Sequence, residues 1–146
     1  MATGPTRQAP NPEHMIVADR EGVITAWGND CVKVFGYGAD EARGQTVALI
    51  IPPVLHTRHW RGFNRAVDTG QLKRPGSTLN VPAIHRGGAV LAVKGTLTLN
   101  RADDETVDGV TLTLLGEGSR WAAMAWRALL AVLNAGAAVG RRVRRA

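Results

Sequence analysis

The sequence predicts an α+β fold in which helices cover one face of a five-stranded antiparallel sheet, with one further helix at the C-terminus. Two short runs rich in β-branched and aromatic residues, 14–19 and 22–27, lie near the N-terminus. Three longer strand candidates, 78–85, 89–99 and 107–115, follow in the second half. Short helical segments and one longer helix lie between the two groups of strands. This segregated order is typical of an antiparallel sheet with its helices on one side.

The turns between the strand candidates support antiparallel pairing. Asp19–Gly22 separates the first two runs, and Arg86-Gly87-Gly88 is a tight turn between the third and fourth. Asn100–Glu105 is a longer acidic loop before the last strand. Apolar and polar residues alternate through 93–99, which is the pattern of a half-buried strand.

The segment from Leu55 to Gly70, LHTRHWRGFNRAVDTG, predicts the longest helix before the final three strands. At about 100° per residue, its apolar and aromatic side chains and both histidines fall within roughly 160° of the helix surface. Three arginines and Asp68 lie on the other side. His59 is near the middle of the apolar side, where an imidazole needs a hydrogen bond or a metal as a partner.

Composition and charge narrow the class of protein. The chain has 146 residues, enough for one domain with a single core. The whole excess of positive charge, +6, lies after residue 118, so we expect no specific nucleic acid partner. Cys31 is the only cysteine, which excludes an internal disulfide and a cysteine-rich zinc site and fits a reducing compartment. The polar, proline-rich start has no apolar core of a signal peptide, and we expect a disordered lead and a cytoplasmic protein.

Three motifs and a hairpin carry a resemblance to a known family. The motifs are IVADREGVITAWGND, VFGYGADEARGQTVALIIPP and LHTRHWRGFNRAVDTG, and the hairpin is VPAIHRGGAVLAVKGTLTL. Together they resemble the PAS family of sensory domains from about His14 to Leu115. The resemblance implies a five-stranded antiparallel sheet, a helical face, and a cavity between them for a cofactor or small ligand. We therefore divide the chain into a disordered lead 1–13, a PAS domain 14–116, an apolar helix 117–140 and a basic tail 141–146.

The same resemblance suggests which cofactor the cavity binds. Flavin-binding LOV domains carry an Asn-Cys motif beside the flavin, and Cys31 in GNDCVKVFG matches neither that motif nor its position. Haem-binding PAS oxygen sensors carry their axial histidine on the long helix after an arginine, as in Arg58-His59. The resemblance thus implies haem b with His59 as the iron ligand, and sensing of a diatomic gas or of redox state. Cavity walls are expected from apolar side chains of the helix and the strands: Leu55, Trp60, Phe63, Leu79, Val81, Leu91 and Leu97.

Two positions depart from the oxygen sensors. Leu79 stands where those proteins have an arginine that responds to bound ligand, and Arg65 falls on the polar side of the helix. Without such a hydrogen-bond donor, we expect a ferrous haem to favour carbon monoxide or nitric oxide over stably bound oxygen, or to take a second protein ligand.

The sequence pattern around His59 also allows two roles without haem. A buried histidine that donates to a backbone carbonyl would have the same pattern. A zinc site with His56, three residues earlier, lacks cysteine or carboxylate companions on the helix. The chain contains no catalytic triad order, phosphate loop or HExxH motif, so a sensor is favoured over a small haem enzyme, with a cofactor-free PAS module for dimerisation or protein interaction as the alternative.

The C-terminal segment 121–139 is apolar or small apart from Arg127 and Asn134, and the cluster RRVRR follows it. A helix packed on the sheet or on a second subunit, an interfacial membrane helix formed by residues 119–146, and a membrane-spanning helix are the three alternatives. We expect a homodimer as the usual form, with peripheral membrane contact through residues 119–146 as the alternative role.

Overall fold

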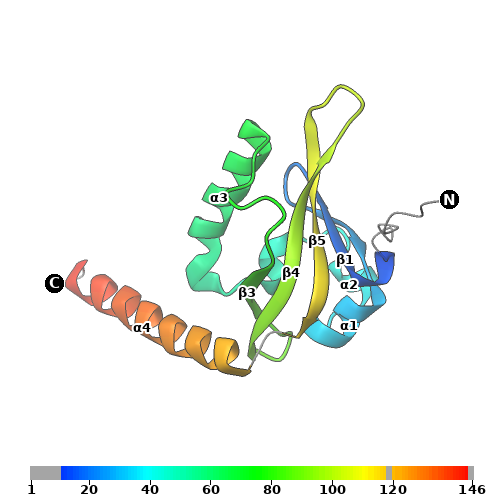
Figure 1. Ribbon diagram of the computed structural model, residues 1–146. Helices are drawn as coiled ribbons and strands as arrows, with labels where there is room; N and C mark the ends of the chain where they lie inside the picture. Colours follow the sequence, from blue (N-terminus) through cyan, green and yellow to red (C-terminus); the bar gives the residue numbers. More distant parts are fainter. Residues whose placement is uncertain (1–10, 118–119, 145–146) are drawn as a thin grey trace.

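The computed structural model describes residues 11–117 and 120–144, and its centre is one five-stranded antiparallel sheet. The strand order is β2-β1-β5-β4-β3 (Figure 1). The first two strands of the chain and the last three therefore meet at β1 and β5, which pair along their length. This confirms the fold class and the number of strands that the sequence predicts. Most of the predicted disordered lead, 1–13, and the last two residues of the predicted basic tail lie outside the described residues.

The N-terminal hairpin consists of β1 (Met15–Asp19) and β2 (Ile24–Trp27). The carboxylate of Asp19 accepts hydrogen bonds from the backbone N–H groups of Glu21 and Val23, each at 2.9 Å. Gly22 adopts a φ of 80°, a left-handed conformation that glycine tolerates better than other residues. The turn thus depends on an aspartate and a glycine, as tight turns often do.

The second group of strands is β3 (Leu79–Ile84), β4 (Val90–Arg101) and β5 (Val107–Glu117). Leu97 of β4 lies opposite Leu112 of β5, and Leu99 lies opposite Val110. Paired residues point to the same side of a sheet. These four side chains therefore face the helical layer together.

The helical layer is made of short elements and one long helix. The short elements are α1 (Asn29–Phe35), α2 (Ala39–Ala42) and the 3₁₀ turns η1 (Pro12–His14), η2 (Val47–Ile50) and η3 (Pro53–Leu55). The long helix α3 (His56–Thr69) ends at Gly70, whose φ is 69°. Its bounds lie within one residue of the segment 55–70 that the sequence predicts.

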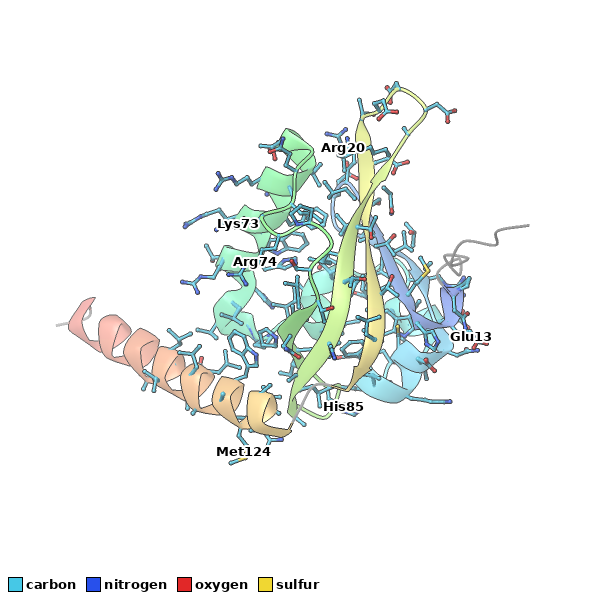
Figure 2. The ribbon with its side chains drawn as sticks, in the orientation of Figure 1. Glu13, Arg20, Lys73, Arg74, His85 and Met124 are labelled. Atoms are coloured by element: carbon cyan, nitrogen blue, oxygen red, sulfur yellow. The ribbon has the colours of Figure 1, made fainter. Side chains whose placement is uncertain are left out.

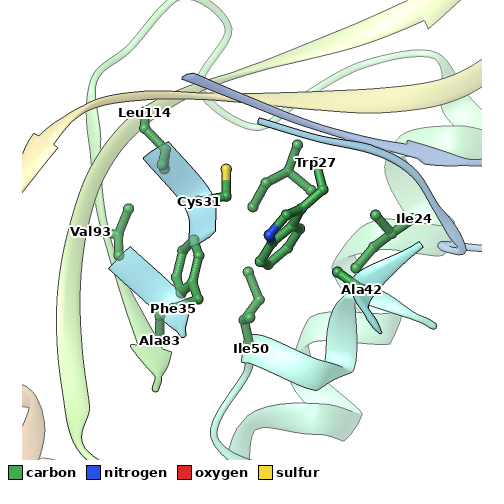
Figure 3. Close-up of a cluster of buried hydrophobic side chains, with 10 residues drawn as sticks. Ile24, Trp27, Cys31, Phe35, Ala42, Ile50, Ala83, Val93 and Leu114 are labelled. Atoms are coloured by element: carbon green, nitrogen blue, oxygen red, sulfur yellow. The ribbon is translucent and has the colours of Figure 1, made fainter. Parts of the chain in front are cut away.

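The hydrophobic core has two parts. The larger cluster packs α1, α2 and η2 against the sheet, with Trp27, Cys31 and Phe35 near its centre (Figure 3). The smaller cluster consists of Phe63, Val67 and Val107, which join α3 to the start of β5. Residues of both clusters border the cavity described below.

The C-terminal helix α4 (Arg120–Arg144) extends past residue 140, the end that the sequence predicts. It contacts β3, β4 and η3, and Leu130 is only 4% exposed. Figure 1 shows the rest of α4 projecting away from the domain. Of the three alternatives for the C-terminal helix, packing on the sheet therefore describes the contacts that the first half of α4 makes. Among the described helices, none combines the length and the hydropathy that a transmembrane span requires.

Candidate ligand-binding cavity

A cavity of about 490 Å³ lies between α3, the sheet and the first half of α4. Its size falls within the roughly 300–1,000 Å³ that is usual for small-molecule sites. The sheet provides a wall of small and branched apolar side chains: Ile16, Ala18, Val81, Pro82, Ala83, Val93, Leu97, Val110 and Leu112. Such a wall favours an apolar ligand, because it removes apolar ligand surface from water.

The helix α3 provides the opposite wall. The lining side chains recur at helical spacing along one face of α3 and the residue before it: Leu55, Arg58, His59, Gly62, Phe63 and Ala66. Gly62 leaves its part of the wall open, since a Cβ placed there would meet no atom within 4 Å. Five of these six residues lie on the face that sequence periodicity predicts to be buried, whereas Arg58 comes from the side that it predicts to be polar.

His59 is the most unusual member of the lining. Its Nδ1 atom is buried and has no hydrogen-bond partner among the described residues. The ring packs edge-on to Trp60 at 5.0 Å and tilted to Phe63 at 6.0 Å, both between centroids. Burial, helped by the nearby charge of His56, lowers the pKa of His59 from 6.5 to about 4. The imidazole is therefore neutral at neutral pH, which is the form that binds a metal.

His56 differs from His59 although it precedes it by less than one turn. Its Nε2 donates to the carbonyl oxygen of Ile51 at 2.8 Å. The described residues contain no group of three or more His, Cys, Asp or Glu side chains that could hold a metal ion. The zinc alternative with His56 therefore has no ligand set in this part of the chain.

Five of the eight predicted site residues line the cavity, and three do not. Leu55, His59, Phe63, Val81 and Leu97 border the space. The ring of Trp60 turns toward the β1–β2 turn, close to Gly22, and packs edge-on to Phe63 at 5.5 Å. The side chain of Leu91 packs into the larger core cluster, and Leu79 lies opposite Gly95, outside the lining.

The part of the wall that α4 supplies was not predicted from the sequence. Trp126, Leu129 and Leu133 line the cavity although they lie more than 50 positions after His59. Their i, i+3, i+7 spacing marks one face of a helix. That signal was available, but helical spacing alone does not say which surface the face packs against.

The exposed lining residues mark the mouth of the cavity, and they lie on α3 and α4. Leu129 and Leu133 are 45% and 37% exposed although they line the cavity. Arg58 is exposed as well, and among the described lining residues it alone carries a charge at neutral pH. A ligand with an apolar body and an acidic group would place that group near Arg58. Arg65 is exposed and outside the lining, on the polar side of α3 as the sequence predicts.

Cys31 lies outside the cavity lining and fully buried in the larger core cluster. Its Sγ atom is 3.7 Å from the carbonyl oxygen of Met15. Burial raises the pKa of the thiol from 9.0 to about 11, so the thiolate is scarce at neutral pH. The interpretation of Cys31 as a small core residue agrees with these surroundings.

Comparison with known proteins identifies the fold and nothing finer. No protein-family model matches the sequence, and no curated protein matches it. A PAS domain of a protein from Colwellia psychrerythraea aligns with a TM-score of 0.56 and 18% identity over 67% of this chain and 80% of that one. The dark-state structure of the blue-light photoreceptor Aureochrome1 LOV aligns with a TM-score of 0.59 and 11% identity over 82% of this chain and 86% of that one. The PAS domain of the fruit-fly ELK potassium channel aligns with a TM-score of 0.54 and 11% identity over 70% of this chain and 85% of that one.

These likenesses, together with the strand order and the helical layer, define the class of structure. The chain has the PAS fold, as its sequence motifs imply. At these identities the comparison shows the fold alone, and the cofactor has to be argued from the cavity.

Proposed function

We propose that this chain is a PAS sensory domain whose cavity binds haem b, with His59 as the axial ligand of the iron. One observation carries the proposal: a neutral imidazole with an unsatisfied buried nitrogen lies in the wall of a cavity of about 490 Å³ whose lining is apolar apart from His59 and Arg58. A buried polar group without a partner costs roughly 1–3 kcal/mol, so a ligand that satisfies it gains affinity.

The residues present fit a haem in three respects. The apolar walls suit the porphyrin, which is a large apolar disc. His59 is uncharged and supplies a nitrogen ligand of the kind that holds haem iron in many proteins. The exposed guanidinium of Arg58 at the mouth is available to pair with the acidic propionate groups.

When bound, the haem would supply an iron that takes a diatomic gas or changes its oxidation state. Among the described residues, the lining contains no arginine other than Arg58, and Leu79 and Arg65 both lie outside it. We therefore expect weak stabilisation of bound oxygen, and carbon monoxide or nitric oxide as the preferred ligands.

The test is an absorption spectrum of the chain expressed with haem supply. We expect a Soret band that shifts when carbon monoxide is added to the reduced protein. The change His59→Gly should remove the axial ligand and alter the band, and added imidazole should restore it. This rescue separates loss of a ligand from loss of the fold.

The matched control is His56→Gln, since His56 is the other histidine of α3 and its ring is already held by Ile51. This variant should keep the wild-type spectrum. A colourless protein, or a Soret band that is the same in His59→Gly and in the wild type, would show that His59 does not ligate haem.

A further inference from the structure

The solvent side of α4 is apolar where it faces away from the domain. Met124 is 56% exposed and Val132 is 68% exposed. Ala125 and Ala128, which share this side, are exposed as well. Leu130, on the opposite side of the helix, is 4% exposed and packs on the domain. Figure 2 shows Met124 pointing away from the sheet and from α3. The helix thus has two apolar sides, and only one of them is covered by the described residues.

The charges of this segment all have one sign. Residues 118–146 contain six arginines and no aspartate or glutamate. Arg127 is exposed within the described part of α4, and Arg141, Arg142 and Arg144 belong to its last turns. A second copy of the chain would bring the same positive charge to the interface, and the two copies would repel each other. A negatively charged surface would be attracted instead.

We propose that α4 binds the surface of an anionic lipid bilayer through this exposed apolar side. A helix with an apolar side and arginines beside it has the composition of an interfacial helix, which lies in the plane of the membrane. Arginine side chains are long enough to keep their charge among the lipid head groups while the apolar residues are buried. The cavity mouth adjoins the same helix, because Leu129 and Leu133 line the cavity.

The experiment is co-sedimentation of the full chain with two kinds of vesicle. One kind contains phosphatidylcholine alone, and the other contains equal parts of phosphatidylcholine and phosphatidylserine. We expect binding to the phosphatidylserine vesicles that weakens as salt is added. Arg141→Gln/Arg142→Gln should weaken this binding about 30-fold, because each arginine near an anionic surface contributes a factor of about five. Met124→Ser/Val132→Ser should weaken it at least about tenfold through the lost apolar burial.

The matched control is Val32→Ser/Lys33→Gln on α1, which removes one exposed apolar and one basic residue elsewhere on the surface. This variant should bind like the wild type. The proposal is overturned if the chain does not bind phosphatidylserine vesicles, binds both kinds equally, or loses binding in the control. It is also overturned if Met124→Ser/Val132→Ser converts a dimer to a monomer while vesicle binding stays unchanged. Each result is independent of whether haem is bound.

Discussion

At the scale of single residues, the two histidines of α3 show how position decides chemistry. His56 begins the helix and reaches back to the carbonyl oxygen of Ile51, which satisfies one ring nitrogen. His59 lies less than one turn later, between Trp60 and Phe63, where no described group accepts from or donates to Nδ1. The same side chain is therefore a structural hydrogen-bond donor at one position, and at the other it has a buried ring nitrogen without a described partner.

The burial of Cys31 leads to a prediction about reactivity. Its thiol pKa is raised to about 11, and a thiolate is the reactive form. At pH 8 we expect iodoacetamide to modify Cys31 at least about 100-fold more slowly in the folded chain than in guanidinium chloride. The rate in the folded chain should rise as the pH increases toward 11, because a larger fraction of the thiol is then deprotonated. Similar rates in the two states would show that Cys31 is exposed to reagent.

Gly22 leads to a second prediction at this scale. A Cβ at this position would lie 2.4 Å from the ring of Trp60, and φ is 80°. The change Gly22→Ala should therefore lower the free energy of unfolding by about 2–4 kcal/mol, through backbone strain and displacement of Trp60. Gly76→Ala is the matched control, since φ is 73° there and no atom lies within 4 Å.

For this control we expect a loss of only about 1 kcal/mol, from the backbone alone. Denaturant unfolding followed by tryptophan fluorescence measures both variants. Equal losses would show that the contact between Gly22 and Trp60 does not constrain the turn.

At the scale of elements, α4 has two apolar sides, and only one of them packs on the described part of the domain. Leu130 is 4% exposed and Val132, two positions later, is 68% exposed. Leu130→Ala should weaken the packing of α4 by about 2–3 kcal/mol. The amides of residues 122–134 should then exchange with solvent roughly 30-fold faster or more. Val132→Ala should leave the exchange unchanged, and equal effects of the two variants would contradict the packing of α4 through Leu130.

The elements also show what the sequence could and could not predict. The strands were predictable because each hairpin has its own turn residues, such as Asp19 and Gly22, and these act locally. The span of α3 was predictable because its apolar side and Gly70 mark its face and its end. The place of α4 was not, since Trp126 and Leu130 have the pattern of any packed helix and the surface they contact is set by the whole fold.

The residues of the candidate site were also predictable only in part. Helical periodicity placed His59 and Phe63 on the inner face of α3, and alternation placed Leu97 on one face of the sheet, whereas Val81 was expected from the family resemblance. Periodicity did not distinguish the cavity from the core that borders it. Trp60 lies at the edge of the apolar arc, and it packs toward Gly22 instead of the cavity.

At the scale of the whole molecule, the cavity joins three parts of the chain that are far apart in sequence. Its walls come from the sheet, from α3 and from α4, so a ligand in the cavity would contact all three. A ligand that binds only the folded state stabilises it by about 2.7 kcal/mol when present at 100 times its dissociation constant. We therefore expect haem, when present at 100 times its dissociation constant, to raise the free energy of unfolding of the chain by about 2.7 kcal/mol.

A variant that fills the cavity should lose this gain. Val81 lines the space from β3, so the ring of Val81→Phe would occupy part of the cavity. The neighbouring change Asn80→Phe is the matched control, because Asn80 is exposed and adjacent residues of a strand point to opposite faces. Denaturant unfolding with and without haem should show the gain in the wild type and in Asn80→Phe, and little gain in Val81→Phe. If haem raises the free energy of unfolding of all three proteins equally, haem binds outside this cavity. The unsatisfied nitrogen of His59 would then be a feature of the packed core and not of a haem site.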